Sequence, residues 1–294
     1  MKIQNNKENS KYKFTIFIMS YNRCDFLFNK TLKLLKKYEY TGDWYVVVDD
    51  NDPQLDKYKK RIPENKLLIY NKKEIGSTFD NMDNFGIQHV VAYPRNFINQ
   101  IVKTMDYDYY LVLDDDYIAL AYKKDDYEIL REKPAPKKID KIIEYMIEFL
   151  ENSNIHTVCL AQAGDYIGGM NSNMIIKGYS RKCMNSFFAK KETNLDFIGH
   201  INEDVNTYIY YGSLGKVFLT YGRLFFRQEQ TQLNKGGMSE IYINNGTYLK
   251  SFYSKMIMPS CIDIVPMGQN HLRIHHNVKW NNCVPMIIDE RWKK

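Results

Sequence analysis

Short apolar runs alternate with amphipathic segments along the first part of the chain. The apolar runs have the length and the β-branched and aromatic content of buried strands, and they lie at 14–19, 44–48, 67–70 and 109–113. Apolar residues recur at helical spacing from 26 to about 42 and again over 97–105. This alternation predicts an α/β fold with a mostly parallel central sheet flanked by helices.

Three of these strands end in polar clusters. Residues 20–23 (SYNR) follow the first strand, 49–52 (DDND) follow the second, and 114–116 (DDD) follow the strand at 109–113. Ligands of open α/β sheets bind at the carboxyl ends of the strands. One such cluster alone is equally typical of a solvated loop, but three clusters at one edge predict a functional site.

The second half of the chain mixes element types. Residues 125–138 are charged and carry two prolines, which predicts a linker or exposed loop. Helical periodicity returns over 139–150, and we expect strands at 156–163 and 216–221. Residues 228–239 (QEQTQLNKGGMS) are polar with a Gly-Gly pair and are expected to form a mobile loop.

Asp114, Asp115 and Asp116 place three like charges together, which calls for a compensating cation. Mg²⁺ or Mn²⁺ takes carboxylate oxygens and can hold a diphosphate as well. The run therefore indicates metal-assisted chemistry on a phosphate-bearing substrate, with Asp114 and Asp116 as metal ligands. A solvated acidic loop is the alternative for this run alone.

A second acidic pair, Glu203-Asp204, opens a predicted helix that continues through Leu214. Acids are common at helix amino termini because of the helix dipole. A carboxylate here can also act as a general base toward an acceptor hydroxyl. We expect Asp204 to be that base, with Glu203 as the alternative.

Histidines gather near the carboxyl end at His271, His275 and His276. Their spacing is compatible with a helix or a strand; on a strand His271 and His275 share one face and His276 points to the other. One imidazole could complete a metal shell, more readily for Mn²⁺ than for Mg²⁺. His275 is the candidate, and a structural role is the alternative.

The composition is that of an ordinary globular protein, with 44% hydrophobic and 26% charged residues. No apolar stretch approaches the roughly 18–20 residues that span a bilayer, so no membrane association is expected. Residues 1–12 are polar and lysine-rich, unlike a secretory signal, and predict a disordered lead-in. Five scattered cysteines without a CxxC pair fit a reducing cytoplasm. The net charge of +6 suits a polyanionic partner, although the bias toward Asn, Lys, Ile and Tyr is also typical of an AT-rich genome.

Taken in order, the motifs resemble those of the GT-A fold nucleotide-sugar glycosyltransferases. Five strings carry the resemblance: Ser20-Tyr21-Asn22-Arg23, Val48-Asp49-Asp50, Arg95-Asn96, Leu113-Asp114-Asp115-Asp116 and Glu203-Asp204. They are similar to the family's T/S-Y-N-R, V-D-D, A-R-N, DxD and E-D motifs. Two features depart from the family: no Q-x-x-R-W string is present, which argues against a processive synthase, and residues 51–53 replace the usual glycine-serine.

The resemblance implies roles for these residues. It implies that Asp114 and Asp116 bind Mn²⁺ or Mg²⁺, that a UDP-sugar is the donor, and that Asp204 is the base. It also implies contacts with the nucleotide sugar for a larger group: Ser20, Tyr21, Asn22, Arg23, Asp49, Asp50, Arg95 and Asp115. Residues 13–124 would then form the nucleotide-sugar-binding half, and 125–294 the acceptor-binding and catalytic-base half, an α+β portion of the same domain.

Within this fold the chain looks most like the phage TET-associated DNA-base glycosyltransferases. The hints are one compact domain, the lack of a membrane anchor, the positive charge, and the block at 202–205 followed by a polar Gly-Gly loop. The resemblance implies double-stranded DNA with hydroxymethylated bases, such as 5-hydroxymethylcytosine, as acceptor, in the cytoplasm (the host's, for a bacteriophage protein). Lys235, Arg223 and Arg227 are candidates for holding the DNA backbone, with a solvated basic surface as the alternative.

Other interpretations stay open at this point. A GT-A glycosyltransferase acting on a saccharide, lipid-linked or protein acceptor fits the same motifs. A nucleotidyltransferase also uses a metal at acidic strand ends, but it usually carries a Gly-rich loop where SYNR stands here. A binding module with a decayed site fits less well, because every expected carboxylate is present.

Overall fold

The structure is a computed structural model, and it describes residues 11–86, 89–126, 129–135, 137–182, 186–228, 239–267 and 272–283. Most of the expected lead-in (1–10) and of the expected polar loop (229–238) lies outside the described residues. So do His271 and Lys235.

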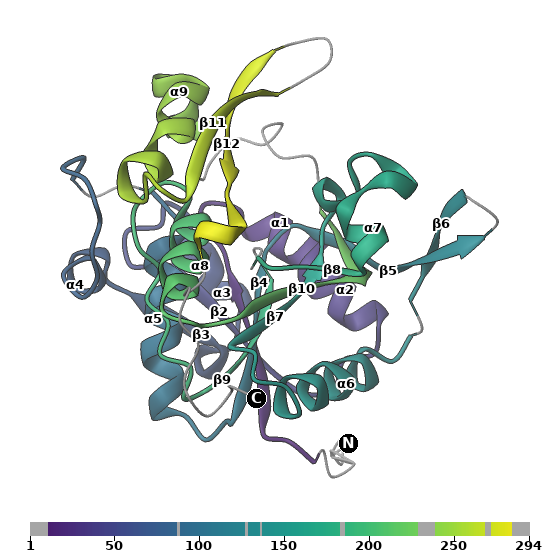
Figure 1. The fold of residues 1–294 in the computed structure, drawn as a ribbon. Helices are drawn as coiled ribbons and strands as arrows, with labels where there is room; N and C mark the ends of the chain where they lie inside the picture. The colour runs from purple at the N-terminus through teal and green to yellow at the C-terminus, as the bar shows by residue number, and fades with distance from the viewer. Residues whose placement is uncertain are drawn as a thin grey trace, which may run out of the picture.

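Ten strands of the described chain form one sheet in the order β3-β2-β1-β4-β9-β7-β10-β5-β6, with β8 paired to β10 (Figure 1). The four strands β3, β2, β1 and β4 are parallel, whereas antiparallel pairings predominate in the second half. The strands are β1 (Phe14–Met19), β2 (Asp43–Asp49), β3 (Leu67–Tyr70), β4 (Tyr109–Asp114), β5 (Tyr117–Asp126), β6 (Ile129–Pro134), β7 (Thr157–Ala161), β8 (Tyr179–Ser180), β9 (Phe187–Lys190) and β10 (Phe218–Gln228).

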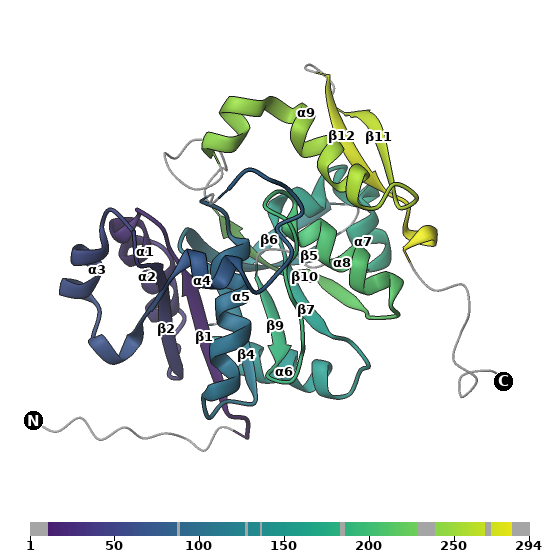
Figure 2. The same ribbon diagram turned by 90° about the vertical axis from the view of Figure 1, so that its left-hand side faces the viewer.

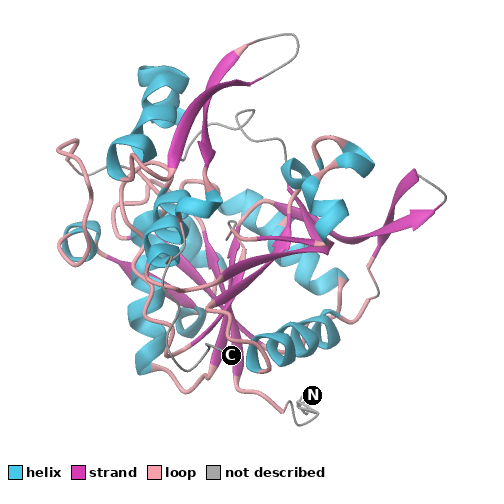
Figure 3. Cartoon of the chain, viewed as in Figure 1, coloured by secondary structure: helices cyan, strands magenta, loops and turns pink. Residues whose placement is uncertain are grey.

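Helices cover both faces of this sheet, which confirms the predicted α/β architecture (Figure 3). They are α1 (Cys24–Asn29), α2 (Thr31–Lys37), α3 (Leu55–Arg61), α4 (Lys72–Gly76), α5 (Ala92–Ile101), α6 (Ile139–Glu151), α7 (Asn173–Lys177), α8 (Glu203–Ser213) and α9 (Ser239–Ile257). Short 3₁₀ turns lie at Glu64–Lys66, Val102–Thr104, Ala163–Tyr166, Gly169–Asn171 and Trp280–Asn282.

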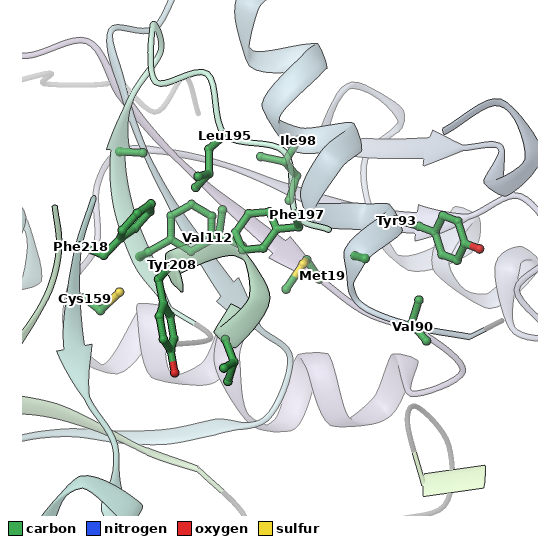
Figure 4. Close-up of a cluster of buried hydrophobic side chains, with 14 of the residues drawn as sticks. Met19, Val90, Tyr93, Ile98, Val112, Cys159, Leu195, Phe197, Tyr208 and Phe218 are labelled. Atoms are coloured by element: carbon green, nitrogen blue, oxygen red, sulfur yellow. The ribbon is translucent and has the colours of Figure 1, made fainter. Parts of the chain in front are cut away.

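Successive side chains of the central strands pack alternately into two separate hydrophobic clusters, one on each face of the sheet. Phe17 of β1 and Val112 of β4 join an apolar cluster that contains residues of α5 and α8 (Figure 4). Ile16 and Leu111, their neighbours along the strands, join a second cluster with residues of α1, α2 and α6. Successive strand residues point to opposite faces, so continuous apolar runs are what a sheet buried on both sides requires.

Helix α9 and the hairpin of β11 (Ile262–Met267) and β12 (Arg273–Val278) lie beyond the carboxyl ends of β1 and β4 (Figure 2). The amino end of α8 also lies on this side, held to α9 by hydrogen bonds from Asn202 to the Lys250 carbonyl and the Ser254 hydroxyl. No helix of the described residues has the length and apolar character needed to cross a membrane.

Several sequence-based boundaries are corrected. The expected loop at 125–138 is largely the antiparallel hairpin of β5 and β6. Its charged residues are as typical of a loop as of a strand, and Pro134 lies at the end of β6, where proline is tolerated. The helix expected at 97–105 begins at Ala92, because Pro94 falls in the first turn, where an amide hydrogen is not needed. The carboxyl-terminal histidine segment is a strand.

Candidate active site

The turn after β1 is fastened to the turn after β2. Asn22 has a φ of 55°, a left-handed conformation that asparagine tolerates better than most residues. Its backbone N–H donates to Asp52 Oδ2 at 2.7 Å, and Asp52 Oδ1 accepts from the Gln54 N–H at 2.7 Å. Burial raises the pKa of Asp52, and these two backbone bonds oppose the rise. Two of the predicted polar clusters therefore lie side by side.

The same turn is fastened to the end of β4 through Asp115. This carboxylate is fully buried; it accepts a hydrogen bond from Ser20 Oγ at 2.6 Å and lies 3.0 Å from the Arg23 guanidinium. Burial raises the pKa of Asp115 to about 7, although Arg23 and Ser20 both favour the charged form. Arg23 also lies 4.0 Å from Asp116. The SYNR and DDD clusters thus form one hydrogen-bonded unit at the carboxyl edge.

Asp114 and Asp116 form the part of this unit that suits a cation. Desolvation raises the pKa of Asp114 to about 7, and the charge of Asp116 adds to the rise. Gln228 at the end of β10 donates to Asp114 Oδ2 at 3.2 Å. A divalent cation would offset the repulsion between the two carboxylates. The described residues contain no group of three His, Cys, Asp or Glu side chains placed to hold a metal. Two carboxylates together with substrate phosphates are, however, a common set of ligands for Mg²⁺.

The end of β2 is neutralised by a lysine that the sequence analysis did not consider. Asp49 is fully buried and forms an ion pair with Lys72, which is itself buried. Lys72 Nζ lies 2.7 Å from His89 Nδ1, and the His89 ring packs on the Tyr21 ring with centroids 4.6 Å apart. Asp50 accepts a hydrogen bond from Asn71 at 2.7 Å. Asn71 and Lys72 directly follow β3, so they form a polar cluster at a fourth strand end. That position in the sequence would have indicated that they belong to the site.

Glu203 opens α8 and is buried against α5. Its Oε1 lies 2.6 Å from Arg95 Nη1, and the two side chains are 7% and 1% exposed. Burial raises the pKa of Glu203 to about 7, Arg95 opposes the rise, and Asp204 adds to it. Arg95 also opposes the rise in the pKa of Asp114. Arg95 is therefore a buried cation that pairs with Glu203 and also favours the charged form of Asp114.

Asp204 is half-buried, and His276 is the histidine on its side. Burial lowers the pKa of His276 to about 4, His275 lowers it further, and the carboxylate of Asp204 opposes this. The His275 and His276 rings stack with centroids 4.4 Å apart. The metal role of His275 stays a prediction. His276, which was not a candidate, is the histidine whose pKa the charge of Asp204 raises.

The fold and this edge define a class: nucleotide-sugar glycosyltransferases of the GT-A type. Parallel strands end in a cluster of three aspartates, and a later helix begins with an acidic pair on the same side of the sheet. The chain belongs to the TET-associated glycosyltransferase family, which matches residues 14–237. The predicted resemblance is confirmed.

Solved structures with a similar fold have low sequence identity. Mannosyltransferase PcManGT from Pyrobaculum calidifontis, in complex with GDP-Man and Mn²⁺, is 12% identical with a TM-score of 0.45, over 77% of this chain and 59% of that one. S. aureus TarS 1-349 in complex with UDP-GlcNAc is 12% identical with a TM-score of 0.41, over 75% and 60%.

Glucosyl-3-phosphoglycerate synthase from Mycobacterium tuberculosis, in complex with Mg²⁺ and UDP, is 8% identical with a TM-score of 0.47, over 91% of this chain and 88% of that one. The chain thus spans about three fifths of the length of the first two proteins. No curated protein sequence matches it.

Proposed function

We propose that the protein transfers a sugar from a UDP-sugar to a hydroxyl on a modified DNA base such as 5-hydroxymethylcytosine. Membership of the TET-associated family supports a DNA acceptor. The observation that carries the proposal is the presence of two distinct acidic clusters, at the end of β4 and the start of α8, with the buried Arg95 paired to Glu203 of the second and favouring the charged form of Asp114 in the first. One cluster suits a metal and a diphosphate, and the other suits an acceptor hydroxyl.

Residues 13–124 would bind the donor. Asp114 and Asp116 would hold Mn²⁺ or Mg²⁺, with His275 as the candidate for a further ligand; a bound cation would offset charge on the departing nucleoside diphosphate. Tyr21 and Asp50 are the candidates for contacts with the nucleoside. Ser20 and Arg23 are bonded to Asp115 at the end of β4, and Asn22 is bonded to Asp52 after β2, so that these residues would fix the shape of the donor site. Asp49 would contribute to the donor site indirectly, through its ion pair with Lys72.

Residues 125–294 would supply the acceptor side and the base. Asp204 would take the proton of the acceptor hydroxyl. The hydroxyl oxygen would bond to the anomeric carbon as the bond from that carbon to the diphosphate breaks. Glu203 fits this role less well, because its carboxylate is buried and paired with Arg95. Direct displacement of this kind inverts the anomeric configuration.

A base within duplex DNA must leave the stack to reach Asp204. Arg227 is exposed and Arg223 half-buried on β10, and they would contact the backbone, which predicts weaker binding at high salt. Nucleotide sugars and DNA meet in the cytoplasm, where we place the reaction.

The test is a donor screen read by mass spectrometry. Duplex DNA with 5-hydroxymethylcytosine is incubated with a panel of nucleotide sugars and Mn²⁺, alongside unmodified DNA and a chelator control. We expect one sugar mass to be added to modified DNA only, and Asp116→Ala and Asp204→Asn to abolish the addition. Transfer to saccharide, lipid-linked or protein acceptors, but never to DNA, would overturn the choice of acceptor and leave the donor chemistry standing.

A further inference from the structure

Residues 195–202, which lead into α8, form no regular secondary structure, and all of them except Asp196 are buried. Their apolar side chains join the core, with Leu195 and Phe197 beside Ile98 of α5 (Figure 4). Buried backbone N–H and C=O groups need hydrogen-bond partners, and this segment has no strand ladder to supply them. Side chains of α5 supply several instead.

Asn96 forms a two-sided bond with this segment. Its Nδ2 donates to the Phe197 carbonyl at 2.8 Å, and its Oδ1 accepts from the Phe197 N–H at 2.7 Å. Asn96 is 1% exposed, so water cannot replace either bond without opening the interior. The amide therefore fixes the backbone at Phe197 in both position and orientation.

Tyr93, one turn earlier on α5, holds His200. The Tyr93 hydroxyl lies 2.8 Å from His200 Nε2, and Asp83 Oδ1 lies 2.8 Å from His200 Nδ1. The His200 backbone N–H donates to the Tyr253 hydroxyl at 3.1 Å. His200 is 2% exposed, so its ring is bonded on both sides within the interior.

Arg95 completes the set at the first residue of α8. Its guanidinium pairs with Glu203 at 2.6 Å and lies over the Phe197 ring, 5.0 Å from the ring centroid. A guanidinium that is 1% exposed and occupied in this way is directed toward the protein interior.

We infer that α5 positions the catalytic base: Arg95 and Asn96 act on Asp204 through Glu203 and the 195–202 segment, and do not bind the nucleotide. This inference rests on the proposed glycosyl transfer. Three residues of α5 each contact one residue that precedes Asp204 in the chain. Asn96 bonds Phe197, Tyr93 bonds His200, and Arg95 pairs with Glu203. Since Asp204 directly follows Glu203, fixing Glu203 also fixes the direction in which the base projects.

A displacement of about 1 Å at a reacting group can cost about 100-fold in rate. Loosening α5 from this segment should therefore lower kcat, while the donor site at the ends of β1 and β4 stays intact. Direct nucleotide binding by Arg95 predicts the opposite, a weaker affinity for UDP. The two roles are separable because UDP binding can be measured without any transfer.

The experiment compares Asn96→Asp and Arg95→Lys with the wild type. Asn96→Asp replaces the donor that faces the Phe197 carbonyl with an acceptor of equal size, and Arg95→Lys keeps the charge with one contact fewer. We expect kcat to fall at least 10-fold, about 1.4 kcal/mol. The KM for the donor and the calorimetric Kd of UDP with Mn²⁺ should stay within threefold.

Asn99→Asp is the matched control. Asn99 lies on the same helix and its amide donates to the Leu195 carbonyl, at a residue further from Asp204 along the chain than Phe197. It should lose a similar amount of thermal stability and keep kcat within threefold. If Asn96→Asp does not fold, Tyr93→Phe removes only a hydroxyl, and we expect it to lower kcat by at least threefold at unchanged Kd.

Two results would overturn the inference while transfer by the wild type stands. One is a Kd for UDP weakened 10-fold or more with kcat preserved, which would place Arg95 at the nucleotide. The other is an equal loss of kcat in Asn99→Asp and Asn96→Asp at equal stability, which would reduce α5 to a structural support. Absence of transfer by the wild type with every donor would overturn the proposed function itself.

Discussion

The two acidic clusters are similar in sequence but differ in environment. Asp114, Asp115 and Asp116 end a central strand, where Arg23 pairs with Asp115 and reaches Asp116 only at 4.0 Å. Glu203 and Asp204 open a helix, where Arg95 lies 2.6 Å from the first acid and the second is half-buried beside His276. The first cluster holds several carboxylates with few counter-charges, whereas the second separates a paired acid from one that is available.

This difference supports the different roles that we propose for neighbouring carboxylates. Excess negative charge at the end of β4 suits a cation and a diphosphate. In the second cluster, the pair with Arg95 leaves Asp204 as the acid that can accept a proton. The residue next to each candidate, Asp115 or Glu203, serves to hold it in place.

The largest effect is expected from removing the available acid. Asp204→Asn should lower kcat by about 100-fold to 10,000-fold, the range for loss of a general base, and leave the affinity for UDP unchanged. Steady-state transfer to hydroxymethylated DNA measures this. Glu203→Gln is the comparison, and a loss of kcat larger than that of Asp204→Asn would reverse the two roles.

The paired acid should matter most for folding. Glu203→Ala leaves the buried Arg95 guanidinium without its partner, and we expect a loss of about 3–5 kcal/mol in the free energy of unfolding. Urea denaturation measures it, with exposed Glu192→Ala as the control. A loss no greater than that of the control would show that the pair contributes little to stability.

The crowded cluster should behave in the opposite way. With a pKa raised to about 7 from the ordinary 3.8, Asp114 keeps a proton in the folded state that the unfolded chain releases. Its charge therefore costs stability above about pH 7, and the cost disappears as the pH falls toward 4.

Asp114→Asn should accordingly stabilise the metal-free protein by about 1–2 kcal/mol at about pH 8 and have no effect at about pH 4. Thermal unfolding across this pH range measures it. Added Mn²⁺ should stabilise the wild type and not the variant. Destabilisation by Asp114→Asn at pH 8 without metal would contradict the view that this cluster carries uncompensated charge.

The smallest effects concern two left-handed asparagines, Asn22 (φ 55°) in the turn after β1 and Asn202 (φ 53°) before α8. Glycine adopts this conformation without strain. Asn22→Gly should change stability by less than about 0.5 kcal/mol. Asn202→Gly should cost about 1–2 kcal/mol, because its amide donates to the Lys250 carbonyl and to Ser254. Equal losses of stability in the two variants, measured by urea denaturation, would show that the side-chain bonds of Asn202 contribute no more to stability than those of Asn22.

The sequence was sufficient to predict the parts that local pattern controls. The strands at 14–19 and 67–70 match β1 and β3, because strands buried on both faces are continuous apolar runs with clear ends. The helix start at Glu203 was likewise predictable from its acids. The hairpin of β5 with the edge strand β6 was missed because charged residues are common in edge strands and in loops alike.

The partners of the site residues could not be predicted. Arg95 and Glu203 are separated by 108 positions along the chain, and no local pattern links them. The same holds for Ser20 with Asp115 and for Lys72 with Asp49. Residue type and strand end located the site, whereas the division of roles within it depended on tertiary contacts.

Calorimetry of UDP binding with Mn²⁺ to Asp116→Asn and Asp204→Asn tests the division between the two clusters most directly. We predict that Asp116→Asn loses Mn²⁺-dependent binding, and that Asp204→Asn binds UDP like the wild type yet transfers sugar at least about 100-fold more slowly. Wild-type binding by Asp116→Asn, or a loss of binding in Asp204→Asn, would contradict the account.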